Sequence, residues 1–304
     1  MATEDFSSRY ADLDAWPTGE AVEALWDGQM AAVAAVRPAL PALAAAVDAA
    51  AEVLRIDGGD GRRPGRLVYV GAGTSGRVAV QDGAELPPTY DWPEDRLVFL
   101  MAGGERALLS SVEGAEDDAE DGRARIAGAE IGPSDVVIGV AASGTTRFTV
   151  AAVEEATRRG AVTVGIACNP RVPLLDAARH PVLADTGPEA IAGSTRMKAG
   201  TAQKVILNLL STAVMIRLGR VYRGLMVDMR PANDKLRRRA AAMVGRVAGC
   251  SADAAAEALA AGDGDVKRAC LIARGVTPDG ATALLARHDG ILRAAMAEVD
   301  EGRI

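Results

Sequence analysis

Four short apolar segments alternate with helix-like segments in the middle of this chain, and this alternation constrains the fold more than any other feature. The four segments end in small or turn-forming residues and cover residues 67–73, 96–103, 135–143 and 162–169. Continuous apolar strands joined by helical crossovers are typical of a parallel sheet with helices on both faces. The sequence therefore predicts a three-layer α/β domain of about five strands, with a fifth at 181–187.

The segments on either side of this region have a helical pattern. Apolar residues recur at three- and four-residue steps from Glu20 to Leu54, and Pro38 and Pro41 divide that stretch into two expected helices. Glycine and proline mark a loop at 56–66. The predicted organisation is an N-terminal helical segment at 1–56, a sheet domain at 57–230 and a small helical module at 231–304.

Two further helical regions are expected after the sheet. Residues 198–218 read as one long helix that is too apolar to face solvent, so it belongs in the core or at a subunit interface. Beyond about Ala232 the sequence predicts only short helices. Their expected turns are at Gly245, Gly249, Gly262 and Gly290.

The bulk composition excludes several classes of partner. The 304 residues carry a net charge of −7 and a sequence pI near 5.1, which argues against nucleic-acid or acidic-membrane binding. The acidic N-terminus is not expected to be a signal peptide, and no apolar run is expected to reach the roughly 18 residues of a membrane span. The three cysteines, Cys168, Cys250 and Cys270, lie far apart and are expected to be free thiols. A cytoplasmic protein is the resulting expectation.

Two strand ends carry loops suited to an anion. Glycines let the backbone approach a ligand closely, and N–H groups and hydroxyls at the start of a helix then surround a negative charge. The first loop, GAGTSGR at 71–77, contributes Gly73, Thr74, Ser75 and Gly76. The second, ASGTT at 142–146, contributes Ser143, Gly144, Thr145 and Thr146.

Other interpretations of these loops are open. GAGTSG fits the GxGxxG pattern of a dinucleotide-binding turn, but no clear ribose-binding acid ends a second strand. A Gly-Thr-Ser turn is also a good helix cap. Two such loops at neighbouring strand ends favour a sugar phosphate, and the lack of a Walker lysine argues against nucleotide hydrolysis.

A third polar stretch, GSTRMKAGTAQK at 193–204, precedes the long apolar helix. It contributes Ser194, Thr195, Arg196, Lys198 and Lys204. Such a cluster is either a solvated helix cap or the side of a pocket that the two loops begin. The second reading is preferred.

Two carboxylates stand out near these loops. Glu85 precedes Leu86-Pro87-Pro88, so the helix that begins near Ser75 is expected to stop there, where the helix dipole favours the protonated acid. Glu116 lies in an acidic run expected to form the first turn of the next helix, where the dipole favours the ionised form. Composition alone does not choose Glu116 over Glu113 or Glu120. His180 and His288 have no ligand-like neighbours, and no metal cluster is apparent.

Several blocks resemble the N-acetylmuramic acid 6-phosphate etherases, a family of the sugar isomerase (SIS) group. They are GAGTSGR, AELPPTY, GAEDDAEDG, GSTRMKAGTAQK and LMVDMRPANDKL, and the similarity extends over nearly the whole chain. The resemblance implies an SIS fold and a C-terminal module similar to a ubiquitin-associated domain. It also implies cleavage of the lactyl ether of N-acetylmuramic acid 6-phosphate to N-acetylglucosamine 6-phosphate and D-lactate, in cell-wall recycling, without metal or organic cofactor.

The resemblance also assigns roles to residues. The family's acid falls on Glu85 and its second catalytic carboxylate on Glu116. The implied reaction is elimination of lactate from C3, after loss of the C2 proton beside the C1 aldehyde, followed by addition of water. Glu85 would protonate the departing lactate and Glu116 would act at C2. Similar proteins hold the phosphate with loop hydroxyls, here Ser75, Ser143 and Thr145 or Thr146. They form dimers, with the 198–218 helix expected near the interface.

Three positions depart from the family pattern as this resemblance describes it. Gly83 stands for a serine, Asp91 for a glycine and Arg147 for a proline. They leave both carboxylates intact but put the contacts to the sugar's N-acetyl and lactyl groups in question.

Two other functions share this architecture. A non-catalytic sugar-phosphate sensor resembling the glucokinase regulatory protein would carry tandem SIS domains, and this chain has one. An SIS isomerase would use the same proton abstraction without a leaving group, and the pairing of the two carboxylate motifs favours elimination. A DNA-binding regulator would need a basic helix-turn-helix region, which the acidic, alanine-rich N-terminal helices do not provide.

Overall fold

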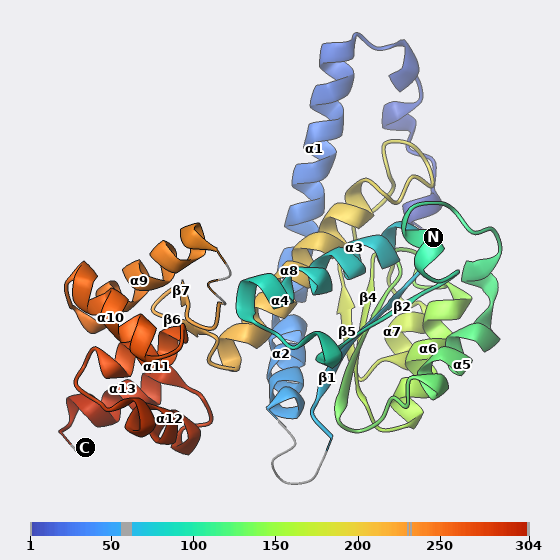
Figure 1. The fold of residues 1–304 in the computed structure, drawn as a ribbon. Helices are drawn as coiled ribbons and strands as arrows, with labels where there is room; N and C mark the ends of the chain where they lie inside the picture. The colour runs from blue at the N-terminus through green and yellow to red at the C-terminus, as the bar shows by residue number, and fades with distance from the viewer. Residues whose placement is uncertain (1, 56–62, 230, 232, 303–304) are drawn as a thin grey trace. The chain divides into compact units, whose positions relative to one another are not determined.

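The computed structural model describes residues 2–55, 63–229, 231 and 233–302. Contacts group these residues into two compact units (Figure 1). The first unit contains 1–84 and 95–214, and the second contains 85–94 and 215–304. The boundaries of these units coincide with neither the expected boundary at 56 nor the one at 230. The division into three domains therefore stays a prediction.

The first unit is built on a parallel five-stranded sheet, as predicted. Its strands are β1 (Arg66–Gly71), β2 (Leu97–Met101), β3 (Asp135–Val140), β4 (Val162–Ala167) and β5 (His180–Leu183). All neighbours are parallel, in the order β2-β1-β3-β4-β5. Each observed strand ends two to four residues before the predicted one, because the last small residues of each apolar run leave the sheet to form loops.

The strand order creates a switch point between β1 and β3. From β1 the chain moves outward to β2, then returns past β1 to β3 and continues in the opposite direction to β4 and β5. Because crossovers of parallel strands are right-handed, the connections on the two sides of this point place their helices on opposite faces. Ligands of open α/β sheets bind at such a point, beyond the carboxyl ends of the strands.

Helices cover both faces of this sheet (Figure 1). One face carries α6, packed on β1, β3 and β4, with α5 and α7 beside it, and the other carries α2 and α3. The helices of this unit are α1 (Thr18–Val36), α2 (Leu40–Leu54), α3 (Gly73–Ala84), α5 (Ala119–Gly128), α6 (Arg147–Arg158), α7 (Pro173–Ala177) and most of α8 (Lys198–Arg217). The predicted break at Pro38 is confirmed, since a 3₁₀ turn at Arg37–Ala39 separates α1 from α2.

Two helical stretches are long and apolar enough to cross a membrane by length and composition alone. They are Thr18–Leu54 and Lys198–Arg217, so the expectation that no stretch reaches this length is wrong by that measure. The core helix of a soluble protein passes the same test, and 56% of the second stretch is buried inside the protein. The first stretch has an apolar face packed on the sheet through α2 and an exposed apolar face on α1.

The second unit is mainly helical. Its helices are α4 (Leu86–Tyr90), α9 (Asp234–Ala248), α10 (Ala252–Ala261), α11 (Val266–Ile272), α12 (Pro278–Arg287) and α13 (Leu292–Asp300). Gly249 and Gly290 have positive φ at the expected turns, whereas Gly245 lies inside α9 and Gly262 has φ −91°. The likeness to a ubiquitin-associated domain stays a prediction.

A small hairpin in the second unit was not predicted. Strands β6 (Val221–Tyr222) and β7 (Leu225–Met226) pair antiparallel around Arg223 and Gly224. Both turn residues have positive φ, 49° and 78°, as in the type I′ turns that match the twist of two-residue hairpins. Strands of two residues leave too short an apolar pattern to detect in sequence.

Candidate functional site

The two predicted anion loops leave neighbouring strands. Gly71 at the end of β1 is in register with Val140 at the end of β3, so residues 72–77 and 141–146 both begin at the switch point. This adjacency is what a shared ligand site requires, and strand order alone produces it.

The first loop is closely packed and is tied to α8. Gly73 has φ +52°, and a Cβ on Gly76 would lie 2.3 Å from Met101 Sδ and 2.9 Å from the carbonyl carbon of Gly71. Glycine is therefore required at Gly76 for the loop to approach the strand. Thr74 is half-buried, and the buried Ser75 donates its hydroxyl proton to Gln203 Oε1 at 3.0 Å.

Gln203 is a residue that the sequence reasoning missed. Its side chain is fully buried, and its Nε2 has no hydrogen-bond partner among the described residues. If the amide turned by 180°, Nε2 would donate to Ser75 Oγ, and the serine proton would be free for an anion. The pair Ser75–Gln203 thus has two hydrogen-bonding arrangements, one of which suits a phosphate.

The second loop is held by side chains from elsewhere in the first unit. Gly144 has φ +72°, and the amide and hydroxyl of Thr145 both donate to Ser143 Oγ, at 3.2 and 3.1 Å. Asn169, just after β4, donates to the carbonyl of Ala142 at 3.1 Å and to the buried Thr3 at 2.8 Å. Thr146 is half-buried at the N-cap of α6. In the sequence Asn169 is only the last residue of the predicted strand 162–169, and no local pattern indicates its long-range contacts.

The third predicted stretch serves α8 itself. The buried carboxylate of Glu189 accepts hydrogen bonds from the amides of Lys198 and Ala199, at 2.9 and 3.0 Å, and so occupies the N-terminus of α8. Lys198 Nζ donates to the carbonyl of Pro188 at 2.9 Å. Ser194 and Thr195 are half-buried in the turns before the helix, and Arg196 is exposed. Fewer N–H donors are therefore available to bind an anion at this helix start than the sequence suggested, because Glu189 already accepts from two of them.

Lys204 lies near a buried acid behind the first loop. Asp82 on α3 accepts from Tyr69 Oη at 3.1 Å and from Ser211 Oγ at 3.3 Å. Burial raises the pKa of Asp82, and these hydrogen bonds and the charge of Lys204 oppose the rise. Burial also raises the pKa of Tyr69 well above its usual value. This network joins β1, α3 and α8 and stabilises the helix that begins at the first loop.

A hollow of about 240 Å³ opens at the carboxyl ends of β1 and β2, and is called here the sheet-edge hollow. Two predicted site residues, Gly73 and Glu116, line it. It is also lined by four polar or charged residues that the predicted site did not include: Arg77, Ser110, Ser111 and Glu113. The other predicted residues of the two loops and of 193–204 do not line it.

The local structure around Glu116 differs from the prediction. Glu116 lies in a separate 3₁₀ turn, η7 (Ala115–Asp117), and not in the first turn of α5. The cap of α5 is Asp118, whose side chain accepts from the amide of Asp121 at 2.9 Å. Glu116 is exposed at the hollow, where it can meet a ligand rather than serve the helix.

Glu85 stands between two helices. It follows α3 directly, as predicted, but it also takes the N-cap position of α4, with φ −85° and ψ −10°. The sequence prediction considered only the dipole at the C-terminus of α3. Because α4 begins at the next residue, the dipole at its N-terminus also acts on the Glu85 carboxylate, in the opposite direction. By its contacts Glu85 belongs to the second unit, while Glu116 belongs to the first.

Two departures from the family pattern have explanations in backbone and packing. A Cβ on Gly83 would lie 2.5 Å from the ring of Phe99 and 2.8 Å from that of Tyr69, so glycine accommodates these stacked rings. Asp91 has φ +50° at the C-cap of α4, a left-handed conformation that glycine favours and aspartate tolerates. Arg147 is exposed at the first residue of α6.

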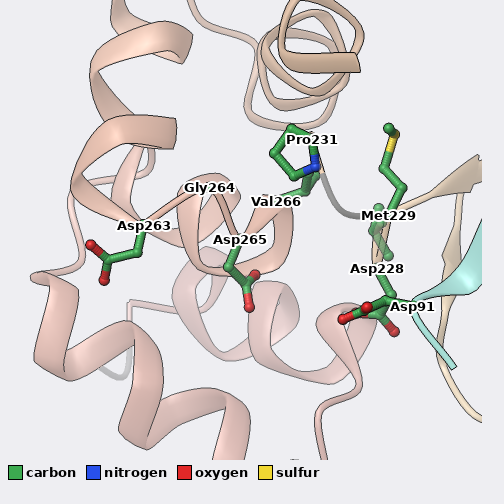
Figure 2. Close-up of a pocket in the computed structure, with 9 residues that line it drawn as sticks. Asp91, Asp228, Met229, Pro231, Asp263, Gly264, Asp265 and Val266 are labelled. Atoms are coloured by element: carbon green, nitrogen blue, oxygen red, sulfur yellow. The ribbon is translucent and has the colours of Figure 1, made fainter. Parts of the chain in front are cut away.

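The second unit contains a larger hollow of about 480 Å³, called here the acidic hollow (Figure 2). Asp91, Asp228, Asp263 and Asp265 line it together with Met229, Pro231 and Val266. Burial raises the pKa of Asp228, and Lys267, whose Nζ lies 2.7 Å from its carboxylate, opposes the rise. Within the described residues, no three His, Cys, Asp or Glu side chains are placed to hold a metal ion.

No cysteine or histidine is among the described residues that line the two hollows. All three cysteines are free, as predicted, and burial raises the pKa of Cys168 and Cys270 to about 12. Burial, with the nearby Arg179, lowers the pKa of His180. His288 Nε2 contacts Glu298 at 2.7 Å.

Comparisons with known proteins give a consistent assignment. A family model described as the glucokinase regulatory protein N-terminal SIS domain matches residues 47–157, and the SIS domain model matches 118–213. A Deinococcus radiodurans protein named N-acetylmuramic acid 6-phosphate etherase is 52% identical over 89% of this chain and 86% of its own length. A Streptomyces avermitilis protein of the same name is 47% identical over 98% of this chain and 94% of its own.

A solved structure supports the fold. It belongs to a candidate phosphosugar isomerase involved in capsule formation, from Bacteroides fragilis. The TM-score is 0.50 at 21% identity, over 68% of this chain and 95% of that one.

Proposed function

The chain belongs to the N-acetylmuramic acid 6-phosphate etherase family, and we propose that it is a carbon–oxygen lyase acting on that sugar. Its products are N-acetylglucosamine 6-phosphate and D-lactate, a step in the recycling of cell-wall amino sugars. The similarity to relatives of that name over nearly the whole chain carries this proposal. A sensor function is not favoured, because those relatives match at high identity from end to end.

The reaction proceeds by elimination and then hydration. In the ring-opened sugar the C1 aldehyde acidifies the C2 proton, and Glu116 removes it. The C3–O bond breaks, a C2=C3 double bond forms, and Glu85 gives a proton to the departing lactate oxygen. Water then supplies a hydroxyl to C3 and a proton to C2, so the net change is addition of one water molecule. Positioned carboxylates of this kind contribute about 100- to 10,000-fold each to a rate.

The phosphate group is assigned to the two loops at the switch point. Ser75, Ser143 and Thr145 or Thr146 supply hydroxyl donors, with the backbone amides of the glycine turns beside them. The adjacency of Gly71 and Val140 supports a single site formed by both loops. The alternative hydrogen-bonding arrangement of Ser75 and Gln203 supports Ser75 as a donor.

The test is release of D-lactate from N-acetylmuramic acid 6-phosphate, run in water enriched in ¹⁸O and in D₂O. Elimination and hydration place ¹⁸O in the C3 hydroxyl of the sugar and deuterium at C2. Direct hydrolysis at the lactyl carbon would place ¹⁸O in lactate and would contradict the lyase assignment. Absence of lactate release by the wild-type protein would contradict the proposed function itself.

We also propose that the protein forms a homodimer. Four large apolar side chains on α1, Val22, Trp26, Met30 and Val33, are 44–60% exposed and recur at helical spacing, so they form one stripe. On the buried side of α1, Gln29 accepts from Thr201 of α8 at 2.5 Å. The stripe favours α1 over the largely buried α8 as the interface. Light scattering should give a dimer mass for the wild type and a monomer mass for Trp26→Glu.

A phosphorylated sugar is a metabolite of the cell interior, so we propose a cytoplasmic location. Fractionation of cells that express the protein tests this, with activity expected in the soluble fraction.

A further inference from the structure

Arg77 is the cation of the sheet-edge hollow. It lies on the second turn of α3, four residues after Gly73, and is the only Lys or Arg among the described residues that line the hollow. Glu113 and Glu116 line the same space, and Ser110 and Ser111 add hydroxyls. The other lining residues are glycine, alanine, methionine and valine, so Arg77 is the group of this hollow that is suited to an anionic part of a ligand.

Only one of the three guanidinium nitrogens of Arg77 makes a hydrogen bond to the described residues. Its Nε donates to the carbonyls of Ala107 and Leu108, both at 3.1 Å, in the 3₁₀ turn η6 (Glu105–Leu108). Its two terminal nitrogens make no hydrogen bond or ion pair within the part of the chain that the structure describes. The plane of the guanidinium is thereby fixed, while its two-pronged edge stays available. Such preorganisation lowers the entropy cost of binding.

The proposed substrate carries two anions that must be recognised separately. Its phosphate lies at C6, whereas its carboxylate belongs to the lactyl group on O3, next to C2. A group that binds this carboxylate must therefore be close to the residue that acts at C2. Arg77 and Glu116 satisfy this condition, because both line the sheet-edge hollow.

We propose that Arg77 binds the carboxylate of the lactyl group and so makes the enzyme specific for a 3-O-lactyl sugar whose acid is free. This inference rests on the proposed function and adds to it a residue for the leaving group. Arginine and carboxylate form two parallel charge-assisted hydrogen bonds, and the pairing also holds the C3–O bond in one orientation.

The experiment compares N-acetylmuramic acid 6-phosphate with its lactyl carboxamide, which keeps the ring, phosphate and ether. The wild type should prefer the acid in kcat/KM by roughly 10- to 100-fold, since a hydrogen bond to a charged group is lost with the amide. Arg77→Gln should lose a similar factor on the acid and far less on the amide, so that the preference falls toward 1. Arg77→Lys should keep part of the preference.

Matched controls separate this role from a structural one. Arg106→Gln removes an exposed cation from the same turn that does not line the hollow, and it should keep the wild-type ratio. Binding of N-acetylglucosamine 6-phosphate, which has no lactyl group, should be unchanged in Arg77→Gln and reports that the fold and phosphate loops are intact.

Two outcomes would overturn the inference while leaving the etherase function in place. One is equal turnover of acid and amide by the wild type. The other is an equal fall on both substrates in Arg77→Gln, which would make Arg77 a positioning residue for η6. The wild-type ratio needs no variant, so equal turnover of acid and amide would overturn the inference even if Arg77→Gln fails to fold, and Arg77→Lys then tests the residue.

Discussion

The sheet-edge hollow and the acidic hollow differ in size and in charge, and the charge is the better guide to function. The acidic hollow has about twice the volume, 480 against 240 Å³, but four aspartates line it. The sheet-edge hollow sets one arginine beside two glutamates and two serines. A substrate with a phosphate and a carboxylate is repelled by the first arrangement and finds a cation in the second. The smaller cavity is thus the better candidate for the chemistry.

The largest expected effect separates two glutamates of the sheet-edge hollow. Glu116→Gln should lower kcat by about 100- to 10,000-fold, because the amide cannot remove the C2 proton. Glu113→Gln, at the same hollow, should lower it by less than about tenfold. Initial rates of D-lactate release measure both, with the unfolding midpoint as the control for folding. If Glu113→Gln lowered kcat more than Glu116→Gln does, Glu113 and not Glu116 would be the residue that removes the C2 proton.

In the acidic hollow the corresponding large effect should be on stability. Lys267 is buried and binds both Asp228 and the carbonyl of Gly290. Lys267→Met leaves the partly buried carboxylate of Asp228 without its nearest cation, although Arg220 Nη1 stays 3.7 Å away. The free energy of unfolding should therefore fall by about 2–3 kcal/mol at pH 7, less than for a fully buried pair.

The deficit of Lys267→Met should depend on pH. The pKa of Asp228 is raised in the folded protein, so its ionised form costs folding free energy at pH 7, and this cost disappears as acid protonates the carboxylate. Removing Lys267 enlarges the penalty, so the difference from wild type should shrink as pH falls from 7 toward 4. Urea unfolding at several pH values checks this. A deficit that is constant over this range would mean that Asp228 is not the cause.

A smaller effect is expected on α6, away from both hollows. Hydrogen bonds from Arg158, then Arg159, lower the pKa of Glu155 to about 2. The ionised form therefore stabilises the fold fully above the unfolded pKa of about 4.5, and this contribution is lost as pH falls toward 2. Glu155→Gln should cause a small loss of stability at pH 7 and almost none at pH 2.5. A loss that grows in acid would contradict the sign.

The smallest effect should come from Asp265→Asn. Asparagine keeps the cap on the amide of Arg268, which Asp265 accepts at 2.9 Å, while one charge leaves the acidic hollow. Unfolding free energy should change by no more than about 0.5 kcal/mol, and kcat/KM for the sugar phosphate should stay the same. A change in KM of threefold or more would show that the acidic hollow takes part in substrate binding.

The sequence predicted the parts of the site that depend on local pattern. Apolar runs with small residues at their ends located all five strands, and glycines with hydroxyls located the two loops. It could not locate Glu116 relative to α5, because an acidic run fits a helix start and a 3₁₀ turn equally well. Nor could it tell whether Asp91 contacts the substrate or only ends α4 at positive φ, since the identity of one residue does not reveal its backbone conformation.

By itself, then, the sequence determined the α/β class and the approximate positions of the five strands, and through its resemblance to a family it proposed the two carboxylates. The tertiary structure decided the partners of each site residue. Ser75 meets Gln203, Asn169 holds the Ser143 loop, and Arg77 reaches the turn before Glu116. The residues of these contacts are 128, 27 and 30 positions apart in the sequence, respectively. The physical reason is the strand order: β1 and β3 become neighbours only when the sheet forms, and no local pattern encodes which loops will then lie side by side.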